Sequence, residues 1–244
     1  MTMALDLAGV RKRYGDRDVL QGIGLNVEPG EVFAIVGPSG AGKTTILRCV
    51  DFLARPEAGS IRYDGRTASR DLRELLALRR RIGMIDQNPL LFRGSVFYNV
   101  TYGLCARGVE GPDLRVRGFR ALEAVGLLGL VDARASGLSA GEAQRVAFSR
   151  AIVSRPDLLL LDEFTANLDP ANVNALEAAV RGYNRETGAT VVLVTHNLFQ
   201  AKRLARRVAL LMDGEIVETA PTEKFFESPR DPRTKAFVRG EFAY

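Results

Sequence analysis

The sequence predicts an α/β fold, in which helices pack on a parallel sheet and a helical segment is inserted into it. Three continuous apolar runs, 32–36, 158–161 and 191–194, are typical of strands that are buried on both faces. The second and third runs each follow a helical stretch, which is the alternation that parallel sheets show. Between Pro89 and Arg155 this alternation stops, because three helical patterns follow one another with no strand between them.

The individual elements are predicted in order along the chain. The first thirty residues favour short strands with turns. The whole chain, 1–244, is expected to be one domain, with an α/β core from 1–88 and 156–244 and a helical subdomain from 89–155. Strands are predicted over 19–27 and 215–218 and helices over 43–53, 97–104, 114–125 and 142–153, before a polar helical tail.

The composition sets limits on the class of protein. With 244 residues, 46% of them hydrophobic, the chain can bury one sizeable core. No apolar run approaches the roughly 20 residues that cross a bilayer, and Asp6 and Arg11 interrupt any secretory signal, so we expect the chain to stay in the cytosol. Cys49 and Cys105 match no metal or redox spacing, and the single histidine excludes a multi-histidine metal site.

The net charge of +5 gathers in runs of arginine. Such runs are typical of solvated faces, and the alternative is a surface for nucleic acid or lipid headgroups. No aromatic residues interleave the runs, as a platform for stacked bases would require.

A glycine-rich loop follows the first apolar run and leads into a helix. Glycines let backbone N–H groups converge on phosphate oxygens, and the helix N-terminus adds positive charge. Lys43 can reach the β- and γ-phosphates of a nucleotide, and the Thr44 hydroxyl can bind Mg²⁺. The alternative is a chance glycine-rich turn, but strand, loop and helix in this order favour a phosphate loop. The loop consists of Gly37, Pro38, Ser39, Gly40, Ala41, Gly42, Lys43 and Thr44, with Thr45 next to it.

Two adjacent carboxylates, Asp162 and Glu163, end the second apolar run. Asp162 is expected beside the glycine loop, where it can hold a metal ion directly or through water. Glu163 is expected to point elsewhere and to act on an attacking water molecule. The alternative for Glu163 is an acid that only complements a helix dipole.

His196 follows the third apolar run. A lone histidine is usually a core or surface residue. Here it comes at the end of a core strand, where ligands bind in open α/β sheets, so we expect a functional role.

A second loop, Leu138-Ser139-Ala140-Gly141-Glu142, also leads into a predicted helix. The Ser139 hydroxyl, the Gly141 backbone and the helix N-terminus together form a second anion-binding device. In isolation, an ordinary N-cap with a capping acid would be the better explanation. A chain with one nucleotide would then have two anion-binding devices. This is explained if the second device binds the nucleotide of a partner copy.

Over essentially its whole length the chain resembles the nucleotide-binding subunit of an ABC transporter. The resemblance rests on the two loops and segment 158–163, together with His196, Gln87 in Asp-Gln-Asn-Pro, and Asp169 in Asn-Leu-Asp. It implies a single ABC ATPase domain: a P-loop NTPase (RecA-like) core with an N-terminal antiparallel β subdomain and an inserted α-helical subdomain.

The resemblance also implies a head-to-tail homodimer that is bridged by two ATP molecules with Mg²⁺. Tyr14 would lie against adenine, Glu163 would polarise the attacking water, and His196 would orient that water and contact the γ-phosphate. Gln87 would sense Mg²⁺ and link the core to the helical subdomain. In this dimer, residues of the two copies would face each other. One copy would contribute Lys43, Thr44, Asp162, Gln87 and His196, and the other would contribute Ser139, Gly141 and Asp169.

Two residues depart from the family pattern. Phe164 stands where the family usually has proline, and Asp86 stands where an aromatic residue usually precedes the glutamine. Neither change removes a catalytic group. Phe164 could shift the backbone that orients Glu163, which would affect the turnover rate more than the mechanism.

The implied partners are membrane permease subunits and, indirectly, a solute-binding protein, with no nucleic acid. The subunit would be peripheral, at the cytoplasmic face of the cell membrane. The surface near Leu90, Leu91, Phe92 and Tyr98 would receive a short helix of the permease. A soluble ABC ATPase acting on nucleic acid is a distant alternative, since those proteins usually carry a coiled-coil insertion or tandem nucleotide domains. A P-loop kinase would not need the Leu-Ser-Ala-Gly-Glu loop.

Three segments bear on the transported solute. Segment 92–104 is similar to oxyanion importers, and segments 195–201 and 234–241 are similar to the tungstate/molybdate type. An importer of tungstate or molybdate is therefore the first expectation. An importer of phosphate or of a polar amino acid is the alternative.

Overall fold

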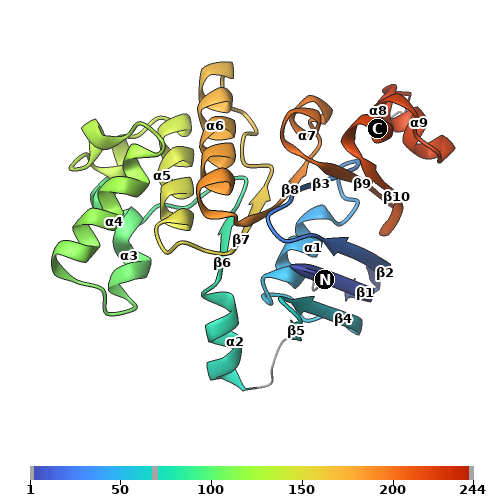
Figure 1. Cartoon of the computed structure of the whole chain (residues 1–244), viewed down its shortest axis with the longest axis horizontal. Helices are drawn as coiled ribbons and strands as arrows, with labels where there is room; N and C mark the ends of the chain where they lie inside the picture. The colour runs from blue at the N-terminus through green and yellow to red at the C-terminus, as the bar shows by residue number, and fades with distance from the viewer. Residues whose placement is uncertain (1–2, 68–70, 242–244) are drawn as a thin grey trace.

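The computed structural model describes residues 3–67 and 71–241. Within these residues the main sheet has six strands in the order β10-β9-β3-β8-β7-β6, all parallel except β10. A second sheet, with four antiparallel strands in the same described ranges, has the order β2-β1-β4-β5 (Figure 1). The predicted α/β core with an antiparallel β part and inserted helices is therefore confirmed.

The strands are β1 (Leu5–Tyr14), β2 (Arg17–Val27), β3 (Val32–Val36), β4 (Ala58–Tyr63), β5 (Arg66–Thr67), β6 (Ile82–Ile85), β7 (Leu158–Asp162), β8 (Thr190–Thr195), β9 (Arg207–Met212) and β10 (Glu215–Pro221). The helices are α1 (Lys43–Val50), α2 (Leu72–Arg79), α3 (Val96–Cys105), α4 (Gly111–Glu123), α5 (Ala140–Ile152), α6 (Pro170–Thr187), α7 (Leu198–Leu204), α8 (Thr222–Glu227) and α9 (Pro232–Val238). Short 3-10 turns lie at Leu128–Leu130 and Ala135–Gly137.

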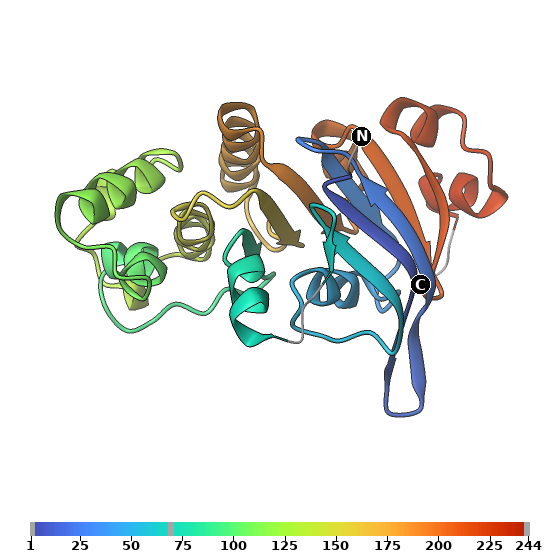
Figure 2. The same ribbon diagram turned by 60° about the horizontal axis from the view of Figure 1, so that its bottom comes forward.

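The central strands β3, β7 and β8 are largely apolar because each face packs on a different core. In β3, Phe33 and Ile35 belong to a core shared with the antiparallel sheet and α1. Ala34 and Val36, which alternate with them, belong to a core shared with helices α3 to α7. Figure 2 shows the blue strands of the antiparallel sheet on one side of the molecule and the green inserted helices α3 and α4 on the other. The carboxyl ends of β3, β7 and β8 meet at one edge, which positions the loops of the candidate site.

Most predicted elements are confirmed, with shifted ends. The inserted helices α3, α4 and α5 are present, and the strand predicted over 215–218 extends to Pro221. The helix predicted over 43–53 ends at Val50, because Phe52 adopts a left-handed φ of +55° that stops it. The division at residues 89 and 155 stays a prediction.

No helix among the described residues combines the length and the apolarity that a membrane span requires.

Candidate functional site

The glycine loop lies between β3 and α1, and its glycines allow other segments to approach closely. Gly42 has a φ of +105°, and a Cβ there would lie 2.9 Å from the Leu20 side chain. A Cβ on Gly37 would overlap the backbone carbonyl of Leu211. Both positions therefore require glycine, which keeps side chains out of this turn.

The Lys43 ammonium group lies inside the loop. Its Nζ donates hydrogen bonds to the carbonyls of Gly37, at 2.8 Å, and Pro38, at 2.9 Å, and lies 3.7 Å from Oε1 of Glu163. Burial lowers the pKa of the Lys43 amine, although the carboxylates of Glu163 and Asp162 oppose this effect. A partly desolvated cation in a backbone loop is suited to bind a phosphate group.

Thr44 connects the start of α1 to the end of β7. Its Oγ1 donates a hydrogen bond of 3.1 Å to Oδ1 of Asp162. Asp162 is 5% exposed, and burial raises the pKa of its carboxyl group. Asp162 therefore lies beside the glycine loop, where the sequence placed it. A hydroxyl and a carboxylate this close fit Mg²⁺, which takes one or two protein oxygens together with water and phosphate.

Glu163 turns away from Asp162 and pairs with His196. Its φ of +43° is left-handed, and its N–H donates to the carbonyl of Val194 at 3.0 Å, which ties the turn to β8. Glu163 Oε2 lies 2.7 Å from His196 Nδ1. A neutral imidazole with its proton on Nδ1 would donate to this carboxylate and leave Nε2 as an acceptor. The two adjacent acids thus have different partners, as the sequence predicted.

One cleft of about 660 Å³ brings most of the predicted residues together. Sequence reasoning missed two of its residues, Arg17 and Val19, which follow the turn between β1 and β2. Arg17 Nη2 donates to the carbonyl of Gly40 at 3.5 Å. No motif marks either residue, so only the fold reveals them. The predicted residues in the cleft are Ser39, Gly40, Gly42, Lys43, Thr44, Thr45, Gln87, Glu163 and His196, while Pro38 and Ala41 line an adjoining hollow.

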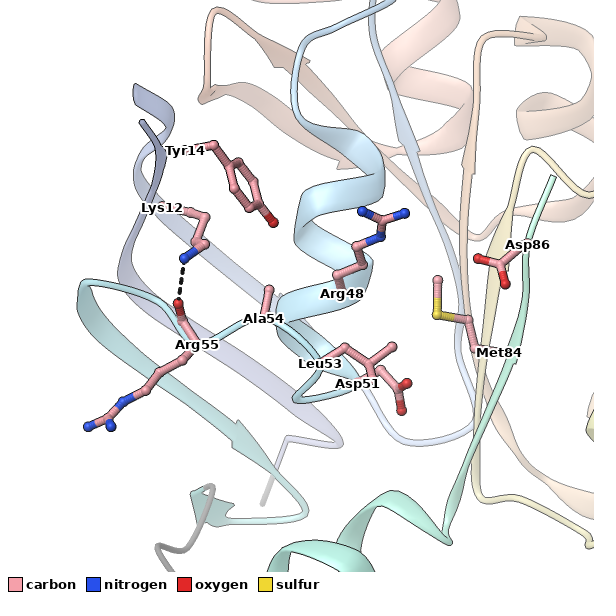
Figure 3. Close-up of a pocket in the computed structure, with 9 residues that line it drawn as sticks. All are labelled: Lys12, Tyr14, Arg48, Asp51, Leu53, Ala54, Arg55, Met84 and Asp86. Carbon is pink, nitrogen blue, oxygen red and sulfur yellow. Dashed lines mark hydrogen bonds between the residues drawn. The ribbon is translucent and has the colours of Figure 1, made fainter. Parts of the chain in front are cut away.

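Tyr14, which was expected against adenine, lies outside this cleft. Figure 3 shows Tyr14 in a neighbouring pocket of about 760 Å³, with Arg48 of α1 and Asp86 after β6. The Nζ of Lys12 lies 5.0 Å from the centre of the Tyr14 ring. The structure therefore does not bring Tyr14 to the Lys43 cleft, and its contact with adenine stays a prediction.

Ser139 forms the N-cap of α5, and a capping box is present. The Glu142 N–H donates to Ser139 Oγ at 3.3 Å, and the Ser139 N–H donates to Glu142 Oε2 at 2.8 Å. The local explanation for this sequence, an N-cap with its acid, is thus present in the structure. Ser139 and Asp169, which caps α6, are both exposed and lie on α-helix ends outside the Lys43 cleft of the same chain.

Phe164 and Asp86, the two departures from the family pattern, have structural roles. The Phe164 side chain is 1% exposed and packs in the core with the helices, so it anchors the turn that carries Glu163. The backbone carbonyl of Asp86 accepts a hydrogen bond from Gln144 Nε2 at 3.3 Å, which joins the segment after β6 to α5.

A strand, a glycine loop and a helix, with an acid at the end of the neighbouring strand, define a nucleotide-binding site of the phosphate-loop class. Comparison with known proteins narrows this class. The chain belongs to the ABC transporter family, whose family model matches residues 20–166. It is an ATPase of this family.

Three relatives illustrate the match. The chain is 43% identical over 250 residues to "Phosphate import ATP-binding protein PstB 2" of Natronomonas pharaonis, covering 98% of this chain and 88% of the relative. It is 45% identical over 248 residues to "Probable anion import ATP-binding protein" of Haloferax volcanii, covering 95% of this chain and 85% of the relative. It is 42% identical over 227 residues to "Methionine import ATP-binding protein MetN" of Bordetella pertussis, covering 92% of this chain but only 63% of the relative.

Two solved structures share the fold. The cbiO1 protein of Clostridium perfringens, part of the ABC transporter complex cbiONQ, superimposes with a TM-score of 0.87 at 28% identity, covering 99% of this chain and all of that one. The ATP-binding cassette MJ0796, a dimer in a post-hydrolysis state with ADP and Pi, superimposes with a TM-score of 0.82 at 30% identity. The match covers 89% of this chain and 98% of that one.

Proposed function

We propose that this chain is the ATP-hydrolysing subunit of an importer that takes up an inorganic anion, with phosphate as the first candidate. The observation that carries the hydrolytic role is the pair formed by Glu163 and His196, with 2.7 Å between the carboxylate and the imidazole. This pair lies in the same cleft as the Lys43 ammonium. A positioned carboxylate beside a phosphate-binding cation is the arrangement that water activation requires.

ATP would bind with its phosphates over the glycine loop. Lys43 would exchange its two carbonyl partners for phosphate oxygens, which are stronger acceptors. Arg17, which lines the cleft and touches Gly40, would add a second cation near the phosphates. Tyr14 would have to reach the adenine from the adjoining pocket, so its role depends on where the base lies.

Thr44 and Asp162 would hold Mg²⁺, with Gln87 in the same cleft as a further oxygen donor. When bound, the ion would neutralise charge on the phosphates. The chain's own contribution is to fix these oxygen atoms: the 3.1 Å hydrogen bond between Thr44 and Asp162 sets their separation. Burial of Asp162 excludes bulk water from that side.

Glu163 would take the proton of the attacking water, and His196 would hold Glu163 in position. The hydrogen bond to His196 Nδ1 fixes one carboxylate oxygen, so the other, Oε1, is oriented toward Lys43 and the phosphates. With its proton on Nδ1, the imidazole keeps Nε2 free of a proton, so this nitrogen could accept a hydrogen bond from the water and orient it. The left-handed turn at Glu163, anchored by buried Phe164, keeps this geometry.

Ser139, Gly141 and Asp169 would complete the ATP site of a second copy in a head-to-tail homodimer. In its own chain none of them lines the Lys43 cleft, and all three lie at the N-terminal ends of α5 and α6, where Ser139 and Asp169 are exposed and Gly141 is buried. Exposed helix N-termini attract anions, and ATP bound to the opposite copy would supply the anion. The dimeric state of the related cassette MJ0796 supports this arrangement.

An exposed aromatic surface would receive the permease. The Phe92 ring lies 4.6 Å from the ring of Tyr102 and 6.4 Å from that of Tyr98, measured between centroids, and Leu90 beside them is 88% exposed. Buried Asn99, which sequence reasoning missed, holds this loop: it accepts from the Phe92 N–H at 2.7 Å and donates to the Phe92 carbonyl at 3.0 Å. Apolar exposed surface held this rigidly is suited to dock a short helix of a membrane subunit. The chain would then lie peripherally at the cytoplasmic face of the membrane.

The relatives favour phosphate over tungstate or molybdate as the solute. Two relatives match this chain over at least 85% of their own length, and they are named for phosphate and for an anion. The similarity to the methionine protein, at 42% identity, makes an amino acid the second candidate. These names do not confirm the first expectation from the sequence, tungstate or molybdate.

Reconstitution in liposomes with the cognate permease and binding protein tests this proposal. ATP hydrolysis should rise with phosphate and not with tungstate, molybdate or methionine. Stimulation by methionine alone would establish the amino acid alternative, and stimulation by tungstate or molybdate alone would restore the first expectation. Absence of ATP hydrolysis under all conditions would contradict the proposed role itself.

A separate variant tests the proposed docking surface for the permease. Leu90→Asp should abolish co-purification with the permease, because it places a charge on the exposed apolar surface. Leu72→Asp, at a leucine of α2 that is 79% exposed, is the matched control and should bind normally. Equal binding by both variants would place the permease elsewhere.

A further inference from the structure

The Asn172 side chain connects two segments that are far apart in the sequence. Its Oδ1 accepts a hydrogen bond of 2.6 Å from Arg145 Nη1 on α5. Its Nδ2 donates a hydrogen bond of 2.5 Å to Oδ2 of Asp169, the N-cap of α6. The Asn172 backbone N–H also donates to Asp169 Oδ1, at 2.9 Å. One carboxamide therefore holds α5 and the loop before α6 at a fixed separation.

Gly141 makes room for this carboxamide. A Cβ at position 141 would overlap the side-chain atoms of Asn172, so the first turn of α5 can approach Asn172 only because residue 141 is glycine. Figure 1 shows α5 and α6 side by side, as this contact requires. The absence of a side chain at Gly141 is thus explained by packing within the chain.

The hydrogen-bond pattern selects an amide at position 172. Arg145 can only donate, and the Asp169 carboxylate can only accept, so the side chain between them needs one acceptor and one donor. A carboxylate would satisfy Arg145 but repel Asp169, and an alkyl side chain would satisfy neither. The hydrogen bonds from Asn172 also lower the pKa of Asp169, which keeps this acid ionised.

We propose that Asn172 is a positioning residue that holds the Ser139–Gly141 loop and Asp169 as one rigid unit. This inference rests on the proposed head-to-tail dimer, in which both elements enter the partner's ATP site. Because Asn172 fixes their separation before dimerisation, the partner's ATP meets a preorganised surface, and the ordering cost of binding is lower.

The experiment compares Asn172→Ala with Asn174→Ala in a Glu163→Gln background. Asn174 is the matched control, since it is an exposed asparagine two residues away on the same helix. Affinity for ADP, measured by calorimetry, should stay within about two-fold for both variants, because Asn172 lies outside the Lys43 cleft. The ATP-dependent dimer, measured by sedimentation, should weaken roughly ten-fold or more only in Asn172→Ala, the scale for losing a hydrogen bond to a charged group.

Hydrogen exchange of the ADP-bound chain provides a readout that does not need the dimer. Amides of 138–143 and of 165–169 should exchange faster together in Asn172→Ala. Asn172→Asp should have the same effect, because it sets two carboxylates against each other. The double exchange of Asp169→Asn with Asn172→Asp, which reverses donor and acceptor, should restore slow exchange in both segments.

Three outcomes separate the possibilities. If Asn172→Ala dimerises as tightly as Asn174→Ala, the positioning role is overturned. Faster exchange in only one of the two segments would also overturn it, because the segments would then not form a unit. If the Glu163→Gln parent itself does not dimerise with ATP, the shared site fails, while the paired change in exchange would still support the link between the two loops.

Discussion

Lys43 and Glu163 face each other across the cleft, with 3.7 Å between the ammonium nitrogen and a carboxylate oxygen. The residue proposed to bind phosphate is therefore in contact with the residue proposed to activate water. A phosphate group that binds Lys43 would compete with Glu163 for its charge. The second carboxylate oxygen would stay with His196, so that Glu163 keeps its position when its partner changes.

Glu163→Gln should bind ATP but hydrolyse it at least about a hundred-fold more slowly, the usual scale for losing a general base. The amide keeps the size of the side chain but cannot take a proton. Phosphate release under single-turnover conditions measures the rate, and calorimetry measures binding. Glu186→Gln, an exposed glutamate on α6, should hydrolyse normally. Near-normal hydrolysis by Glu163→Gln would exclude Glu163 as the base.

Ser139→Arg should abolish the ATP-dependent dimer, because it places a long side chain where the partner's phosphates would approach. The variant is made in the Glu163→Gln background, and the elution volume is compared with and without ATP. Ser136→Arg, at another exposed serine just before the loop, should leave the dimer intact. Unchanged elution of Ser139→Arg would count against a shared site.

Arg203→Ala should destabilise the fold by about 2 kcal/mol, because it leaves a buried carboxylate without its main partner. Arg203 donates two hydrogen bonds to Glu177, at 2.6 and 2.9 Å, and the Glu177 side chain is only 2% exposed. Arg206→Ala, which breaks an exposed pair with Glu28, should cost less than about 1 kcal/mol. Urea unfolding measures both values. Equal losses would show that burial of Glu177 does not set the cost.

Asp51 should make stability fall as the pH rises. Burial raises the pKa of its carboxyl group from 3.8 to about 6, which outweighs the attraction of Arg79 at 3.8 Å. Between these two pH values the folded chain holds a proton that the unfolded chain has released, so this group favours folding most below pH 3.8 and least above about pH 6. This rise in the pKa of Asp51 corresponds to a stability difference on the order of 3 kcal/mol.

Asp51→Asn removes this titration. The variant should be more stable than the parent at pH 7.5, and its stability should change less between pH 4.5 and 7.5. Urea unfolding at both pH values measures the difference, with Asp16→Asn, in an exposed turn, as the control. Parallel pH dependence of the parent and Asp51→Asn would contradict the prediction.

The strands and the phosphate loop could be predicted because their physical requirements are local. A five-residue apolar run such as 32–36 has few alternatives to a buried strand, and the glycines after it fix the turn. Helix α2 could not be found this way, because among its residues only Leu78 is buried and the apolar periodicity is weak. Strand β6 has four residues, too few for a clear pattern.

Within the site, residues inside motifs could be predicted and residues outside them could not. Asp162 and Glu163 end an apolar run, so the sheet topology alone brings them to the glycine loop. Arg17 reaches the cleft only because the antiparallel sheet folds over α1, and Asn172 reaches Arg145 only through the packing of α5 on α6. Such contacts depend on tertiary structure, which no local pattern specifies.

His196 is the only histidine in the sequence, and more than half of its side chain is open to solvent. A proton NMR spectrum of the unlabelled chain should therefore contain a single pair of imidazole signals from the candidate catalytic site. These signals would follow the arrival of a nucleotide and the closing of a second copy over it. The chain thus carries its own spectroscopic probe at the point where chemistry is expected.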